Sequence, residues 1–149
     1  MPSYKSRYTP INAKKYKGDA KKIVARSSWE RTAFKWLDLN PNIKWWASEE
    51  LVIPYICQTD KKKHRYFPDL IFETMEGKKY IIEIKPDRET RPPTPPKSGR
   101  NTRRLITEVA TYQKNMSKWN AAHNFALDTG CTFEVWTEKT MKAMGIKII

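Results

Sequence analysis

The sequence predicts one α/β domain in which a central mixed β-sheet is flanked by helices, in the order α-β-β-β-α-β. An amphipathic helical segment precedes three runs rich in β-branched and aromatic residues. A much longer helical pattern and a last apolar run follow them. The length of 149 residues suits one domain, and 39% hydrophobic residues suffice for one core. We expect residues 26–149 to form this domain and residues 1–25 to form a basic N-terminal arm.

The predicted arm, residues 1–25, is basic and holds few large aliphatic side chains. Seven Lys and Arg residues stand against Asp19, which gives this segment a net charge of +6. Such composition is typical of an extended segment. Two roles remain open, a solvated tail and an arm that lies along DNA phosphates.

The first helix is expected from Ser27 to about Leu39. Ser27 and Glu30 have the spacing of a capping box, in which each residue caps the backbone of the other. Asn40-Pro41 ends the pattern. On a helical wheel, Glu30 falls inside the apolar arc, where an unpaired carboxylate is costly. Glu30 is therefore either a reciprocal cap or a ligand that reaches a cation at the edge of the core.

Three strands are expected next, over residues 50–57, 65–74 and 78–85. All three runs are rich in residues that favour strands. A polar turn separates the first two, and Glu76-Gly77 forms a tight turn before the third. Because the connections are short, we expect the strands to pair antiparallel as a meander.

The segment 86–104 is rich in proline and arginine and is expected to form an irregular, flexible, basic loop. Apolar residues at helical spacing then predict a long helix over 101–129. Because this helix separates the third and fourth strands, the fourth strand is expected to lie parallel in the same sheet. The remaining expected elements are a strand over 131–137, a short helix over 138–144 and a last strand over 146–149.

The charge of the whole chain points to a polyanionic partner. There are 29 Lys and Arg against 16 Asp and Glu, for a net charge of +13. Nucleic acid fits this charge best, and an anionic membrane fits less well because the basic residues do not follow an amphipathic helix. No run of about 18 apolar residues exists, so we expect no membrane span.

The cysteine pattern predicts reduced thiols and no zinc site. Cys57 and Cys131 each lie in an apolar segment, and two cysteines are few for a disulfide framework. Together with His64 and His123 they supply two thiols and two imidazoles. Their spacing matches no compact zinc pattern.

The strongest candidate site combines Pro68-Asp69 with Glu83 and Lys85. Alternation along the third strand places Glu83 and Lys85 on one face, about 6–7 Å apart. The hairpin turn brings Asp69 beside them, close to the helix that carries Glu30. Carboxylate oxygens suit Mg²⁺ or Mn²⁺, and such an ion binds a scissile phosphate and lowers the pKa of a water molecule. Lys85 would hold or deprotonate that water.

These residues resemble the PD-(D/E)XK nucleases, the restriction-endonuclease-like superfamily. The element order α-β-β-β-α-β is the core of that superfamily, and Glu30, Asp69, Glu83 and Lys85 fall on its catalytic positions. Within it, Arg26-Ser27-x-x-Glu30 followed by His64-x-Tyr66-x-Pro68-Asp69 looks like the transposon-end and phage-encoded branch. Three further motifs look like the head completion nucleases of large tailed phages: Tyr4-Lys5-Ser6-Arg7, Ser28-Trp29-Glu30-Arg31 and Trp46-Ala47-Ser48-Glu49-Glu50.

The resemblance implies a Mg²⁺-dependent endodeoxyribonuclease that finishes or trims packaged phage DNA. It implies that the metal is held by Asp69, Glu83, Glu30 and the backbone carbonyl of Ile84, with Mn²⁺ able to substitute. It further implies DNA and phage capsid or neck proteins as partners, a location in the host cytoplasm or the virion, and a monomer or dimer.

Basic residues near this site are expected to contact DNA phosphates. These residues are Arg26, His64, Arg65, Arg100, Arg103, Arg104 and Lys114. Two other functions stay open at this point. One is a non-catalytic protein of the phage head that binds DNA ends, and the other is a Holliday-junction resolvase, which would require a dimer.

Overall fold

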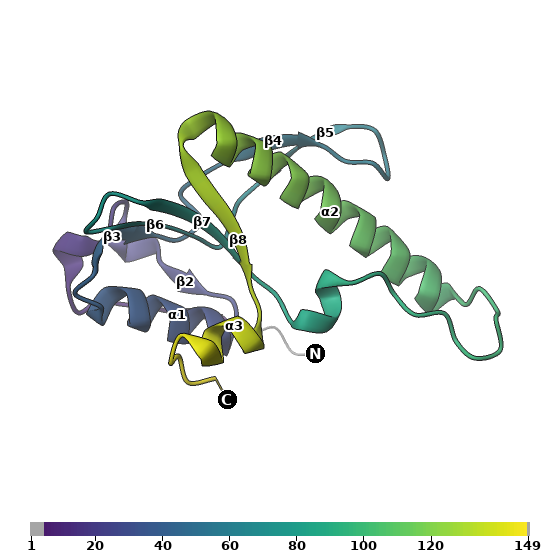
Figure 1. Ribbon diagram of the computed structural model, residues 1–149, viewed down its shortest axis with the longest axis horizontal. Coiled ribbons are helices and arrows are strands. Elements are labelled where there is room, and N and C mark those ends of the chain that lie inside the picture. Colours follow the sequence, from purple (N-terminus) through teal and green to yellow (C-terminus); the bar gives the residue numbers. More distant parts are fainter. Residues whose placement is uncertain (1–4, 149) are drawn as a thin grey trace.

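The protein is described by a computed structural model that covers residues 5–148. Its centre is a four-stranded mixed sheet with the strand order β3-β6-β7-β8 (Figure 1). β3 pairs antiparallel with β6, β6 pairs antiparallel with β7, and β7 pairs parallel with β8. The predicted α/β class and mixed sheet are confirmed. The strands span Ile43–Ala47 (β3), Leu70–Thr74 (β6), Lys79–Ile84 (β7) and Cys131–Trp136 (β8).

Helices cover both faces of this sheet. Figure 1 shows α1 and α3 on one side of the sheet and the long α2 on the other. The α1 side carries the larger core, in which Phe34, Trp46 and Ile82 are fully buried. The α2 side carries a second core that includes Trp119 and Ala122. The helices span Ser28–Leu39 (α1), Arg103–Thr129 (α2) and Glu138–Ala143 (α3).

The ends of the helices follow the expected local signals. The Ser27 side chain accepts a hydrogen bond from the backbone N–H of Glu30, as the capping-box spacing predicts. α2 begins with Thr102 as its N-cap and ends at Gly130, which adopts a left-handed conformation with φ of 73°. Because Gly130 reverses the chain directly into β8, α2 forms the crossover that makes β8 parallel to β7.

The predicted meander over 50–57, 65–74 and 78–85 is wrong in two places. The first run forms a separate two-stranded hairpin, in which β4 (Ile53–Ile56) pairs with β5 (Lys63–Tyr66) outside the main sheet. The second run is broken at Pro68-Asp69 into β5 and β6. The proline lacks a backbone N–H and cannot continue the ladder. The sheet strand that the sequence pattern did not predict is β3, whose adjacent tryptophans point to opposite faces.

Residues 1–25, expected to form an extended basic arm, contribute large side chains to the core in their described part, residues 5–25. Two short strands pair there, β1 (Ser6–Arg7) with β2 (Val24–Ala25). Tyr8, Tyr16 and Ile23 are buried in the larger core. Two 3₁₀ turns connect these strands, η1 (Ala13–Lys15) and η2 (Ala20–Lys22).

Hydrogen bonds to the carboxylate of Asp38 hold this N-terminal segment against α1. Asp38 is fully buried and accepts hydrogen bonds from Tyr8 Oη (3.0 Å) and from the backbone N–H groups of Ile11 (2.7 Å) and Asn12 (3.1 Å). Aromatic anchors and a buried hydrogen-bonded carboxylate therefore hold residues 5–25 on the domain.

Two smaller expectations also need correction. The segment 86–104 contains a 3₁₀ turn, η3 (Asp87–Thr90), before its extended proline run, and α2 starts inside its last two residues. The expected last strand over 146–149 is absent from residues 146–148, and residue 149 lies outside the described residues. Within the described chain, every helix is too short or too polar to cross a lipid bilayer.

Candidate active site

The β6–β7 hairpin brings Asp69 and Glu83 together. Its register pairs Leu70 with Ile82, so the next residue outward on each strand is Asp69 opposite Glu83. Directly opposed residues of an antiparallel pair point to the same face. The Asp69 Oδ2 atom accepts a 2.7 Å hydrogen bond from the backbone N–H of Ile84, which holds the carboxyl group against β7. The two carboxylates are therefore neighbours, as the hairpin turn predicts.

α1 supplies the third carboxylate, that of Glu30. The side chain is buried, and Oε2 accepts a 3.3 Å hydrogen bond from the Ser27 hydroxyl. Among the described residues, none donates a hydrogen bond to Oε1, although that atom is also buried. The N-cap residue Ser27 thus gives a hydrogen-bond partner to only one of the two carboxylate oxygens of Glu30. The charge of Glu30 also acts on Asp69.

Glu83 has two neighbours on the α2 side of the sheet. Tyr66, the last residue of β5, donates a 2.7 Å hydrogen bond from its hydroxyl to Glu83 Oε2. Lys118 projects from α2, and its Nζ lies 5.7 Å from the centroid of the Tyr66 ring. Burial, and then the positive charge of Lys114, lower the pKa of Lys118. The β4–β5 hairpin and α2 therefore both contribute to the surroundings of Glu83.

Lys85 is the first residue after β7. Its backbone N–H donates to the carbonyl of Trp136 at 3.0 Å, which continues the parallel pairing with β8. The side chain is half-buried, and its charge acts on both Asp69 and Glu83. The structure thus places Asp69 and Glu83 side by side, with Lys85 next along the chain after β7 and Glu30 close enough for its charge to act on Asp69.

An ion pair borders the site on the α1 side. Arg26 Nε lies 2.9 Å from Glu49 Oε1, and both charges act on Glu30. Glu49 adopts a left-handed backbone conformation with φ of 55°, which is uncommon outside glycine and costs about 1–3 kcal/mol. Arg26 was predicted to contact DNA, and here its guanidinium is paired with a carboxylate next to the site.

The clustered carboxylates hold their protons more tightly than isolated ones do. Burial, and then the negative charge of Glu49, raise the pKa of Glu30 to about 7. Burial, together with Glu83 and Glu30, raises the pKa of Asp69 well above its usual range. Burial likewise raises the pKa of Glu83. A site that gathers this much negative charge without enough positive charge is suited to bind a cation.

The neighbouring carboxylates of Asp69 and Glu83 suit a hard divalent metal ion, although the ligand atoms of Glu30, Asp69 and Glu83 do not all lie within 4.8 Å of one another. Glu30, Asp69 and Glu83 offer carboxylate oxygens, and Oε1 of Glu30 is a buried acceptor with no donor among the described residues. A divalent cation would offset the burial that raises the pKa values of these carboxyl groups, and the repulsion by Glu83 and Glu30 that adds to it at Asp69. The sulfur and imidazole ligands that zinc favours do not occur among these three residues.

The predicted DNA-contacting residues occupy different parts of the surface. His64 forms a hydrogen bond with Asp60 in the β4–β5 hairpin, and the guanidinium of Arg65 lies 5.8 Å from the centroid of the Phe67 ring.

The other predicted residues lie on or near α2. Arg104 pairs with Glu108 at 2.9 Å. Arg100, Arg103 and Lys114 are exposed, the first two near the start of α2 and the third along it. Their binding to DNA stays a prediction.

The structure adds Tyr66, Lys118 and Glu49 to the surroundings of the predicted site. Tyr66 lies three residues before Asp69, so its proximity to the site had a sequence signal. Lys114 and Lys118 are one helical turn apart on α2. The sequence pattern predicts only that this segment forms the outer surface of a helix. Only the packing of α2 against the sheet distinguishes Lys118 from the other lysines.

Comparison with known proteins gives two matches. A sequence model of the family described as "TnsA-like endonuclease N terminal" matches residues 40–138. The chain is also 42% identical over 147 residues to the head completion nuclease of Enterobacteria phage T4, which covers 97% of this chain and 98% of that protein. No solved structure matches the chain significantly. The family match contains Asp69, Glu83 and Lys85, whereas Glu30 lies before it.

Proposed function

This chain belongs to the TnsA-like endonuclease family, and we propose that it is a metal-dependent endodeoxyribonuclease that acts in phage head completion. The observation that carries the proposal is the cluster of Glu30, Asp69 and Glu83 with Lys85, in which buried carboxylates hold raised pKa values. The identity to a head completion nuclease over nearly the whole chain supports the biological role.

We assign the metal ion to Asp69 and Glu83, with Glu30 and the Ile84 carbonyl completing the protein ligands. When bound, Mg²⁺ or Mn²⁺ supplies a Lewis acid for the scissile phosphate and acidifies a water molecule. The hydrogen bond from the Ile84 N–H orients Asp69 Oδ2, and that from Tyr66 orients Glu83 Oε2. Both carboxylates thus enter the site in fixed orientations, which favours tight metal binding.

Lys85, directly after β7, acts on the phosphodiester. Its ammonium offsets negative charge on the phosphate as the nucleophile attacks, or it holds that nucleophile in place. Lys118 adds a second positive charge on the α2 side, near the Tyr66 ring. The charges of both lysines act on Glu83, so the substrate phosphate meets positive charge from two elements.

The DNA path extends from this site along the segment that follows Lys85. η3, the proline run and the start of α2 line a groove of about 500 Å³, which holds Arg88, Arg91 and Arg104 together with Glu89 and Glu108. Arg91 pairs with Asp87 and Arg104 with Glu108, so a bound strand would exchange these carboxylates for its phosphates. The net charge of +13 supports this non-specific attraction.

A plasmid-cleavage assay tests the proposal. The wild-type protein is expected to cut DNA in Mg²⁺ and to stop when EDTA removes the ion. Asp69→Asn and Glu83→Gln should abolish cleavage and keep or tighten DNA binding, because each removes a metal ligand and a negative charge near phosphate. Glu76→Gln, at the exposed β6–β7 turn, is the matched control and should cut normally. Normal cleavage by Asp69→Asn would refute the metal site.

The same assay separates the proposed enzyme from a non-catalytic protein that binds DNA ends. Such a protein would bind linear DNA in EDTA and release no product in Mg²⁺ or Mn²⁺. The raised pKa values of three carboxyl groups beside a basic surface favour the enzyme. A protein that only binds DNA gains nothing from negative charge at that position.

A further inference from the structure

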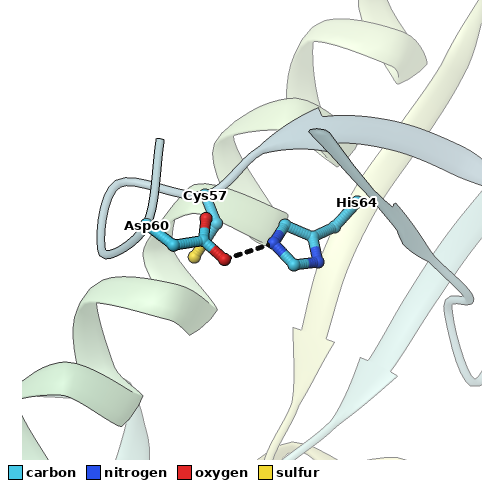
Figure 2. Close-up of side chains that lie close together, drawn as sticks. All are labelled: Cys57, Asp60 and His64. Atoms are coloured by element: carbon cyan, nitrogen blue, oxygen red, sulfur yellow. Dashed lines mark hydrogen bonds and ion pairs between the residues drawn. The ribbon is translucent and has the colours of Figure 1, made fainter. Parts of the chain in front are cut away.

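We propose that Cys57, Asp60 and His64 form a zinc-binding site at the tip of the β4–β5 hairpin, separate from the carboxylate site. Figure 2 shows the Asp60 carboxylate directed at the His64 ring, with the Cys57 sulfur beside the carboxylate. One ligand atom of each residue lies within 4.8 Å of the ligand atoms of the other two. No other such group of three occurs among residues 5–148.

The spacing of these atoms is close to what a tetrahedral ion requires. His64 Nε2 lies 2.7 Å from Asp60 Oδ2. Zinc bonds of about 2.0–2.1 Å to nitrogen and oxygen require these two atoms to be about 3.3 Å apart. A small widening of this pair therefore admits the ion, and the Cys57 sulfur lies within 4.8 Å of both ligand atoms.

The loop between β4 and β5 holds its ligands in place without the ion. The backbone N–H of Lys61 donates to the Cys57 carbonyl at 2.8 Å, and the N–H of Cys57 donates to the Lys62 carbonyl at 3.0 Å. The N–H of Lys62 also donates to Asp60 Oδ1 at 2.9 Å, which leaves Oδ2 directed at His64. Such supporting bonds orient ligands in metal sites.

The two other ligands are held by side-chain contacts. The His64 ring stacks on Tyr55, with 5.6 Å between ring centroids. The Cys57 sulfur lies 3.0 Å from the hydroxyl of Thr59 and is buried, whereas Asp60 and His64 are partly exposed. The site is therefore open to solvent on one side, where a water molecule supplies the fourth ligand.

The donor chemistry selects zinc over the ion of the carboxylate site. A thiolate and an imidazole are ligands that Zn²⁺ prefers and Mg²⁺ does not. Binding releases the thiol proton of Cys57 to solvent. The thiolate and the Asp60 carboxylate then cancel the two positive charges of the ion, which matters beside Lys61 and Lys62.

The sequence pattern groups Cys57 and His64 only with Cys131 and His123, and that set does not gather among the described residues. The missing partner is Asp60, which the turn brings beside His64. A metal ion bound here would link β5 to the turn that precedes it and so stabilise the end of the hairpin. Because β5 contains both His64 and Tyr66, the ion would also stabilise the strand that presents the Tyr66 hydroxyl to Glu83.

Cobalt substitution in the full-length, reduced protein tests the site without any measurement of cleavage. Co²⁺ bound at this site is expected to give a thiolate-to-metal charge-transfer absorption band, and Zn²⁺ should displace it. The carboxylate site cannot give this band because it contains no sulfur. Added Zn²⁺ should also raise the melting temperature, because the ligand binds only the folded state.

Matched variants identify the ligands. Cys57→Ser should abolish the band, and His64→Asn and Asp60→Asn should weaken Zn²⁺ binding at least about tenfold. Cys131→Ser and His123→Asn, the other cysteine and histidine of the chain, should bind as wild type does. Because His64 is partly exposed, His64→Asn tests the site even if Cys57→Ser folds poorly. Absence of the band in wild-type protein, or its loss only in Cys131→Ser, would overturn the proposal.

Discussion

The hydroxyl of Tyr66 donates a 2.7 Å hydrogen bond to Oε2 of Glu83, and both side chains are buried. The bond links two sheets of the protein, since Tyr66 ends β5 of the hairpin and Glu83 lies in β7 of the central sheet. It orients a carboxylate that faces Asp69 and compensates part of its burial. The hairpin outside the main sheet is thereby coupled to the candidate active site.

Tyr66→Phe should lower metal affinity by about 10–100-fold and slow cleavage at limiting Mg²⁺. The phenyl ring keeps the packing, and only the donor to Glu83 is lost. Titration of cleavage rate against Mg²⁺ concentration measures the effect. Tyr55→Phe, a buried tyrosine of the same hairpin, is the control and should titrate like wild type. An unchanged metal titration for Tyr66→Phe would show that the bond serves the fold alone.

Lys85→Arg should not restore the activity that Lys85→Ala loses. Arginine keeps a positive charge, but its planar guanidinium does not replace a compact ammonium and does not deprotonate in a protein. Single-turnover cleavage rates test this, with Lys79→Arg on the exposed start of β7 as the control. A fully active Lys85→Arg would indicate that only the charge at this position is needed.

The raised pKa of Glu30 makes folding stability fall as the pH rises. The native pKa of about 7 lies above the ordinary value of 4.5, so the folded state keeps this proton longer than the unfolded state does. The contribution of this proton to the free energy of unfolding is fully present below about pH 4.5 and is lost as the pH rises through about 7. The shift between the two pKa values corresponds to a contribution of about 3 kcal/mol.

Glu30→Gln should therefore flatten the fall in stability between about pH 5 and about pH 8 in EDTA. Asp69 and Glu83 shift in the same direction, so a part of the fall should remain. Mg²⁺ should stabilise the wild type more at the higher pH, where the ligands are ionised. Denaturant unfolding at both pH values measures this. An identical pH dependence in Glu30→Gln and wild type would contradict the argument.

Replacement of Arg100, Arg103 and Arg104 by Ala should weaken DNA binding and reduce its dependence on salt. The slope of log K against log salt should fall by roughly 0.7–0.9 for each DNA phosphate that the variant no longer neutralises. The melting temperature should stay close to that of wild type, because all three side chains are exposed. Filter binding at several salt concentrations gives the slope. An unchanged slope would place the DNA path elsewhere on the basic surface.

The class of the fold and the proximity of Asp69 to Glu83 could be predicted from sequence patterns, whereas the catalytic roles of the site residues stay predictions. Hydrophobic periodicity placed α1, α2, β7 and β8, since a helix or strand that buries one face must repeat its apolar residues at that period. Alternation along β7 put Glu83 and Lys85 on one face, and the Glu76-Gly77 turn brought Asp69 opposite Glu83. These relations are local, so a sequence pattern contains them.

Which strands share a sheet, and which distant groups meet, became known only from the packed chain. The strands β3, β4 and β5 are all short, and their pairing and packing against β6 or α2 decide which of them joins the main sheet. Tyr8 and Tyr16 lie in a basic segment, and their burial depends on α1 and β3. The placement of Tyr66 and Lys118 beside Glu83, and of Asp60 beside Cys57 and His64, follows from contacts that no local period encodes.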